Sequence, residues 1–157
     1  MKTIITPQIV ISLAFGGEEF ISPQRVTTAD IAAATHRFIV PIMGSALVEK
    51  VADGGYPTLL DQFVAPALAF AVRTLLQPSL NVRTGDAGVM MPQGDNTHAA
   101  WQSTLKTLQL SLKNRTSTLL RMLSDHLSQN SSLYPEYDQK HDILKHCSIN
   151  GGFVQTF

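Results

Sequence analysis

The side chains that could hold a metal ion are few, and they gather near the C-terminal end of the chain. His141, His146 and Cys147 form the one metal-like cluster in the sequence. Their spacing matches no zinc signature, and a fourth ligand is missing. The sequence therefore predicts no metal site and no cofactor.

Two other combinations could serve acid–base or nucleophilic catalysis. Asp125 and His126 are neighbours in the sequence, and neighbouring residues on a helix do not share a face. Lys145 and His146 could lower the pKa of the Cys147 thiol, but a late, irregular segment would hold a nucleophile poorly. We therefore expect a protein that is not an enzyme. Catalysis by Asp125, His126 or Cys147 on a helical bundle is the weakest alternative.

One segment has a one-sided charge. Between Asn96 and Ser124 the chain has no acidic residue. It does have four basic residues, which are Lys106, Lys113, Arg115 and Arg121. The pattern is typical of a solvated helix face, or of a face turned toward DNA or an acidic neighbour.

Composition limits the remaining classes. The chain has 157 residues, which suits one domain, and 44% of them are hydrophobic, which excludes wholesale disorder. Lys+Arg and Asp+Glu both number 12, so no global basic field attracts nucleic acid. A single cysteine excludes a disulfide framework. Only 15% of the residues are charged, well below the usual share of about 25%, so we expect a partner to cover part of the surface.

Membrane and export signals are not expected. The uncharged apolar stretch Gln62 to Val72 is much shorter than the roughly 20 residues of a membrane helix. Apolar residues continue near the N-terminus as far as Phe15, but the Gly16–Glu19 sequence is a poor cleavage site.

The helices that must position these side chains have start and stop signals. Thr6-Pro7 predicts a helix over Pro7 to Phe15, with a strand as its rival. Thr27 and Asp30 predict a capping box, followed by a helix with Ile31, Thr35, Phe38 and Ile42 on one side. Pro41 should kink or split this helix, and its second piece, 42–52, should stop at Asp53-Gly54-Gly55.

The next helix is apolar nearly all round. It is expected over 59–77, capped by Thr58, buried on every side, bent at Pro66 and ended by Pro78. A longer helix should start at Asn96 or Thr97 and reach about Ser128. Its leucine stripe has a polar gap over 115–118. The predicted shared core consists of Phe38, Phe63, Val64, Leu68, Ala71, Leu75, Leu105, Leu108 and Leu112.

The sequence thus predicts a mainly α fold, a small bundle of about four helices with a β-hairpin or long loop near 80–92 and extended terminal segments. The expected divisions are an N-terminal arm (1–26), a helical connector domain (27–128) and a C-terminal docking tail (129–157). A tail that folds back on its own helices is the alternative. The residues expected to bind partners are Val82, Arg83, Val89, Met90, Met91, Tyr134, Tyr137, Ile143, Leu144, Phe153, Val154 and Phe157.

Several stretches together resemble a known family. They are Asp30 to Ala34, His36 to Gly44, Tyr56 with Leu59-Leu60, Val64 to Phe70, Val82 to Gly85, and Tyr134 to Tyr137. This set resembles the small head–tail connector proteins (adaptor or head-completion proteins) of tailed bacteriophages and prophages. The shared residues are packing motifs, and the family has no catalytic residue to carry over.

The resemblance implies a function and a set of partners. The subunits would form a cyclic, dodecamer-type ring that bridges the portal protein to the stopper or tail-completion protein. DNA would pass non-specifically through its lumen. The protein would be made in the cytoplasm of a bacterial host and would end at the head–tail junction of the virion, with no membrane partner. A small helical protein-binding adaptor unrelated to phage, also non-enzymatic, is the alternative.

Overall fold

The computed structural model is mainly helical and describes residues 3–16, 21–80, 83–85, 88–90, 102–145, 147–150 and 153–156. The α-helices are α1 (Pro7–Ala14), α2 (Thr28–Ala34), α3 (Val40–Met43), α4 (Ser45–Ala52), α5 (Pro57–Leu59), α6 (Ala65–Leu80) and α7 (Gln102–Gln129). The π-helical stretches are η2 (Thr35–Ile39) and η3 (Leu60–Val64), and the 3₁₀ turns are η1 (Pro23–Arg25) and η4 (Ser131–Leu133). The strands are β1 (Arg83–Gly85), β2 (Gly88–Met90), β3 (Cys147–Asn150) and β4 (Phe153–Thr156).

Two predicted helix starts are confirmed in detail. The Thr6 hydroxyl accepts a hydrogen bond from the backbone N–H of Ile9 at the start of α1. At the start of α2, Thr27 accepts from the N–H of Asp30 at 3.2 Å, and the Asp30 carboxylate accepts from the N–H of Thr27 at 3.0 Å. These reciprocal bonds satisfy donors that the first helical turn leaves unpaired.

The predicted cap at Thr58 is wrong. The helix begins two residues earlier than predicted, at Pro57, directly after Tyr56 in the left-handed region with φ 55°. Proline suits the first helical position because it has no N–H to leave unpaired. The Tyr56 hydroxyl donates to Glu136 at 2.9 Å, a contact that holds this unfavourable backbone conformation in place.

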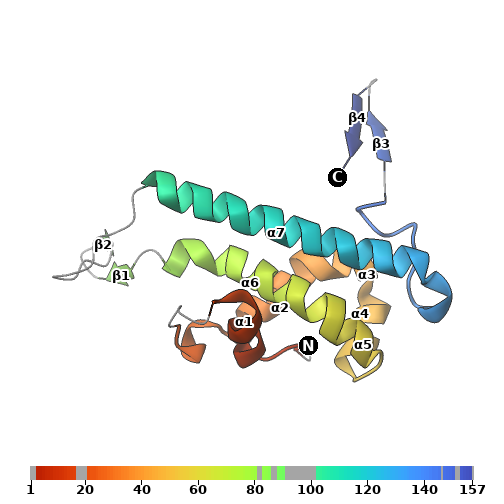
Figure 1. Cartoon of the computed structure of the whole chain (residues 1–157), viewed down its shortest axis with the longest axis horizontal. Helices are drawn as coiled ribbons and strands as arrows, with labels where there is room; N and C mark the ends of the chain where they lie inside the picture. Colours follow the sequence, from red (N-terminus) through yellow and green to blue (C-terminus); the bar gives the residue numbers. More distant parts are fainter. Residues whose placement is uncertain are drawn as a thin grey trace.

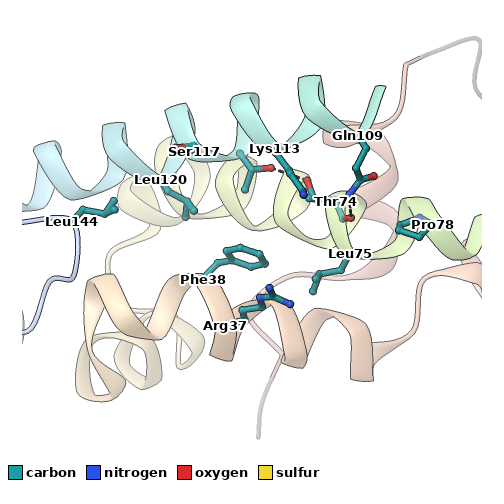
Figure 2. A pocket seen from close by; sticks show the side chains of 11 residues that line it. Arg37, Phe38, Thr74, Leu75, Pro78, Gln109, Lys113, Ser117, Leu120 and Leu144 are labelled. Atoms are coloured by element: carbon teal, nitrogen blue, oxygen red, sulfur yellow. Dashed lines mark hydrogen bonds between the residues drawn. The ribbon is translucent and has the colours of Figure 1, made fainter. Parts of the chain in front are cut away.

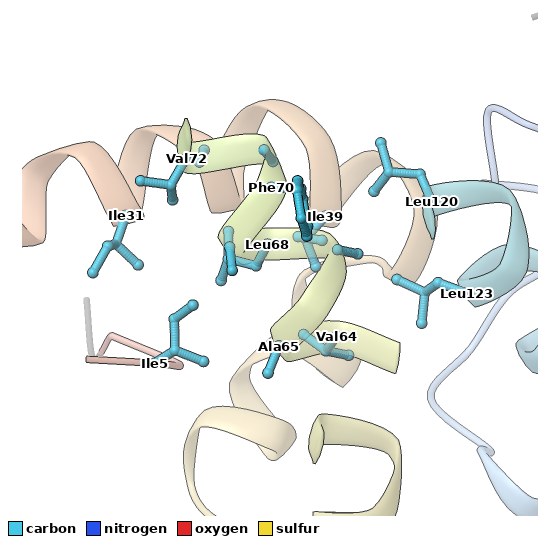
Figure 3. Close-up of a cluster of buried hydrophobic side chains, with 14 of the residues drawn as sticks. Ile5, Ile31, Ile39, Val64, Ala65, Leu68, Phe70, Val72, Leu120 and Leu123 are labelled. Carbon is cyan, nitrogen blue, oxygen red and sulfur yellow. The ribbon is translucent and has the colours of Figure 1, made fainter. Parts of the chain in front are cut away.

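Helix α6 is the centre of the fold. Figure 1 shows α7 along one side of α6, and α1 and α2 pack on it as well. The prediction of burial on every side is confirmed, and Figure 3 shows α6 side chains such as Leu68 and Val72 facing neighbours on several elements. The buried residues of α6 are Ala65, Ala67, Leu68, Ala69, Phe70, Ala71, Val72, Arg73, Thr74, Leu76 and Gln77.

The continuous helical segment Pro57–Leu80 has the length and hydropathy of a membrane span. It has 24 residues and a mean hydropathy of 1.5 over its most apolar window. Within the fold, 67% of that window is buried. This is the arrangement of a core helix that other helices surround.

The N-terminal segment is part of the helical body rather than an extended arm. Helix α1 packs on α6 and contributes Val10 and Ala14 to the core. The guanidinium of Arg73 in α6 donates to the carbonyl oxygen of Ala14 and lies 4.5 Å from the centre of the Phe15 ring. A buried arginine on α6 therefore caps the C-terminal end of α1.

Pro41 does not split its helix, because a π-helical stretch precedes it. Over η2 the N–H of Val40 donates to the carbonyl of Thr35, and this wider turn winds the chain less per residue than an α-helix. The change of phase buries Ile39 and leaves Phe38 half-buried. Phe38, which the pattern places on the buried face, therefore packs only half-buried against the core. The sharp bend of 119° comes later, at Gly44, where φ is 78°.

Pro78 does not end α6, which continues to Leu80. A proline in a helix cannot donate to the carbonyl four residues earlier, here that of Thr74. The side-chain amide of Gln109 in α7 donates to this Thr74 oxygen at 3.1 Å instead. A neighbouring helix thus replaces the hydrogen bond that Pro78 lacks.

Helix α7 is described from Gln102 to Gln129, so its predicted start at Asn96 or Thr97 lies outside the described residues. The polar gap in its leucine stripe includes a residue of the core. Thr116 is buried, and its hydroxyl lies 2.9 Å from that of Thr74. Of the predicted core, Val64, Leu68, Ala71 and Leu112 are buried, and Phe38, Phe63, Leu75 and Leu108 pack around them half-buried. Leu105 is not among the core residues.

The predicted hairpin region contains two short strands. β1 pairs with β2 antiparallel, with Thr84 opposite Val89. Strands β3 and β4 pair in the same manner, with Ile149 opposite Val154. Figure 1 shows both pairs at the margins of the helical body.

Candidate functional site

Asp125 and His126, which the sequence analysis considers for catalysis, have different surroundings in the structure. The ring of His126 is half-buried, stacked on Phe63 with ring centres 4.1 Å apart, and its Nε2 lies 3.0 Å from the Tyr134 hydroxyl. Asp125 is exposed and pairs with Lys145 at 2.5 Å. Asp125 and His126 therefore have different partners and form no dyad.

The predicted metal-like cluster is only partly described. His141 is exposed and pairs with Asp138 at 2.8 Å. His146 and the Cys147 side chain lie outside the description. In the ranges that are described, no group of three His, Cys, Asp or Glu side chains could hold a metal ion.

Tyr134 and Tyr137 are not available to a partner, which corrects their prediction as docking residues. Both are buried against this chain's own helices. The Tyr134 ring packs edge-on against Tyr56, with ring centres 5.0 Å apart. The Tyr137 hydroxyl donates to Asp142 at 2.8 Å. The chain as far as Lys145 thus folds back on the helical body, the alternative that the sequence left open.

Asp142 is the polar centre of this fold-back. Its carboxylate is fully buried and accepts from Ser124 at 2.5 Å, from Tyr137, and from the N–H of Leu144 at 2.9 Å. Burial, and next the hydrogen bond to Asp142, raise the pKa of Tyr137 well above its usual value. The three donors offset the cost of burying this polar group.

A second polar group lies on the outside of the same region. Lys50 donates to Glu136, which also accepts from Tyr56. The hydrogen bond from Lys50 lowers the pKa of the Glu136 carboxyl. Together the two groups attach the residues after α7 to the 50–56 region and to α7 itself.

The other residues that were predicted to bind partners differ in their exposure and in whether the structure describes them. Ile143 is 45% exposed, and its N–H donates to the carbonyl of Pro41 at 3.2 Å. Leu144 is half-buried against the core. The backbones of Arg83, Val89, Met90, Phe153 and Val154 lie in strands. Val82, Met91 and Phe157 lie outside the described residues.

The predicted basic face is divided. Lys106, Lys113 and Arg121 are exposed, and spacings of about two helical turns place them along one side of α7. Arg115 is exposed as well, but its guanidinium lies 4.3 Å from the centre of the Phe70 ring. Arg115 therefore covers part of the core with its side chain. Lys106, Lys113 and Arg121 remain as exposed cations on the opposite side of α7.

An open groove of about 490 Å³ lies between η2, α6 and α7. Figure 2 shows Arg37 and Phe38 on one wall and the side chains of α7 on the opposite wall. We call it the central groove. It is lined by Arg37, Phe38, Thr74, Leu75, Pro78, Gln109, Lys113, Thr116, Ser117, Leu120 and Leu144.

Sequence patterns did not indicate this groove, because tertiary features create it. The π-helical stretch η2 leaves Phe38 half-buried, at the wall of the groove. Pro78 reaches the wall because Gln109 allows α6 to continue through it. The available signal is a proline that follows a helical pattern, and such a proline predicts a helix end.

A comparison with known sequence families finds a match over most of the chain. Residues 35–144 match a sequence family described as "Family of unknown function (DUF6712)". None of the curated proteins and none of the solved structures matches the chain.

Proposed function

The chain belongs to the family of unknown function DUF6712, and from its residues we propose that it is a non-enzymatic structural subunit of a tailed-bacteriophage neck. In this role it forms a ring below the portal protein, contacts the stopper or tail-completion protein, and lines the passage of the DNA. It is made in the bacterial cytoplasm and incorporated at the head–tail junction of the virion.

One observation supports this proposal above the others. Three stretches that carry the resemblance to connector proteins, far apart in the sequence, meet at one junction. Tyr56 packs on Tyr134 and donates to Glu136, and Pro41 and Gly44 line the same surface hollow as Glu136. The resemblance therefore rests on residues that build one unit of the fold, as expected of a shared packing arrangement.

The surface charges are compatible with the same role. Lys106, Lys113 and Arg121 form an exposed line on α7. Repeated around a ring, such lines add to a strong positive field, which could face DNA or an acidic neighbour. A helical binding adaptor unrelated to phage would have the central groove as its main feature and would need no ring.

The direct biochemical test mixes the purified chain with the portal protein from the same genome. Native mass spectrometry is expected to show several copies of the chain on each portal ring. A variant that lacks Thr84 to Gly88 and one that ends at Lys145 locate the contact, and circular dichroism checks that each stays helical. Absence of any complex between the full-length chain and the portal would contradict the proposal and favour the unrelated adaptor.

A further inference from the structure

The central groove combines an apolar interior with a positive rim. Phe38, Leu75 and Leu120 supply apolar surface from three different elements, and Figure 2 shows these side chains directed toward one space. Its volume of about 490 Å³ lies in the range of roughly 300–1,000 Å³ that is usual for ligand sites. The groove is thus large enough for a bulky apolar side chain together with its backbone.

The polar groups on the floor of the groove are already paired within the chain. The hydroxyls of Thr74 and Thr116 lie 2.9 Å apart, and the Gln109 amide donates to the Thr74 carbonyl at 3.1 Å. A ligand would therefore find few unsatisfied partners at the bottom. The part of a ligand that enters the bottom of the groove therefore has to be apolar, since a polar group placed there would lose its hydrogen bonds to water.

The rim of the groove, in contrast to its floor, is positively charged and favours a charged ligand. Arg37 and Lys113 are exposed on facing walls, and none of the described lining residues is acidic. Two cations at the edge of an apolar trough favour carboxylates in the ligand and disfavour a basic segment. The open shape suits a chain segment that lies along the groove and inserts one side chain.

We propose that the central groove binds an acidic segment of a partner protein, with a large apolar side chain in the groove and carboxylates paired with Arg37 and Lys113. The π-helical stretch η2 brings Arg37 and Phe38 to the groove, and π-helical insertions occur often at functional sites. The inference does not depend on the neck assignment, because it needs neither a ring nor a portal.

The test uses the full-length chain and the blocked peptide Glu-Glu-Phe-Leu-Glu-Glu, followed by NMR chemical shifts. Addition of the peptide is expected to shift the signals of Phe38, Leu75 and Leu120. The peptides Lys-Lys-Phe-Leu-Lys-Lys and Glu-Glu-Ser-Ser-Glu-Glu, which lack the charge or the apolar anchor, are expected to shift none of them. The double substitution Arg37→Glu with Lys113→Glu should weaken binding at least about tenfold.

A matched variant separates the groove from general electrostatics. Lys106→Glu with Arg121→Glu makes the same change in net charge on exposed residues of α7 that do not line the groove, and it should keep the affinity. Equal losses in both double variants, or binding of the basic peptide, would overturn the proposal. So would an absence of shifts at millimolar peptide. If concentrating the protein alone shifts the same signals, a second copy occupies the groove and the proposal is wrong.

Discussion

At the scale of single residues, the least predictable feature is the buried carboxylate of Asp142. In the sequence it lies in a polar, charged stretch that is typical of a linker. In the fold it is fully buried and accepts hydrogen bonds from Ser124 and Tyr137. Its donors come from another element as well as from its own segment. A local pattern could not indicate them, because the burial of Asp142 depends on tertiary contacts.

Asp142→Ala should destabilise the protein by about 3 kcal/mol. The change leaves the hydroxyls of Ser124 and Tyr137 buried without their acceptor, and each unsatisfied group costs about 1–3 kcal/mol. Urea unfolding followed by circular dichroism measures the loss. Asp138→Ala, at an exposed carboxylate, is the control and should change stability little. Equal unfolding midpoints for the Asp142→Ala variant and the wild type would contradict the structure.

The raised pKa of Tyr137 predicts how the free energy of unfolding changes at alkaline pH. Its pKa is raised in the folded state, whereas in the unfolded chain it is near 10. Below that pH both states hold the proton, and above it only the unfolded state releases it, so the free energy of unfolding falls as pH rises. Unfolding measured from about pH 9 to 11 should show this decline. Tyr137→Phe should reduce the slope, and an unchanged slope would exclude Tyr137 as its source.

At the scale of elements, local signals predicted several helix starts and missed two continuations. The capping box at Thr27 needs only residues of its own turn, and it was predicted correctly. The passage of α2 into α3 through Pro41 requires a π-helical stretch, and the passage of α6 through Pro78 requires Gln109 from another helix. Propensity alone cannot predict an element that a distant side chain completes.

The pairing of Gln109 with the carbonyl left unpaired by Pro78 can be measured in a double-mutant cycle. Gln109→Ala should cost about 1 kcal/mol in the natural sequence, where it removes the donor to the Thr74 oxygen. In a Pro78→Ala background the new backbone N–H can bond to Thr74, so the same change should cost clearly less. Chemical unfolding of the four proteins gives the coupling. Equal costs in both backgrounds would show that Gln109 does not replace this bond.

At the scale of the whole molecule, the segment after α7 divides at Lys145. The part before this residue holds Tyr134, Tyr137 and Asp142 in buried positions. The part after it contributes strands β3 and β4, which pair with each other. The sequence predicts a single docking tail over 129–157. It does not indicate the division, because the buried residues of the first half are polar or aromatic and have few apolar neighbours in the sequence.

Two truncations test this division. A chain that ends at Ser132 loses the buried tyrosines and Asp142, so it should be strongly destabilised or fail to fold. A chain that ends at Lys145 keeps all three and should retain nearly the full thermal midpoint. Differential scanning calorimetry compares them with the full-length protein. A stable chain ending at Ser132 would mean that the segment is a free tail after all.

The neck assignment is decided by deleting the gene from an inducible prophage and counting particles in the lysate by electron microscopy. The proposed role predicts DNA-filled heads and free tails that do not join, with normal tailed particles restored when the full-length gene is supplied on a plasmid. Normal numbers of joined, infectious particles without the gene would contradict the assignment.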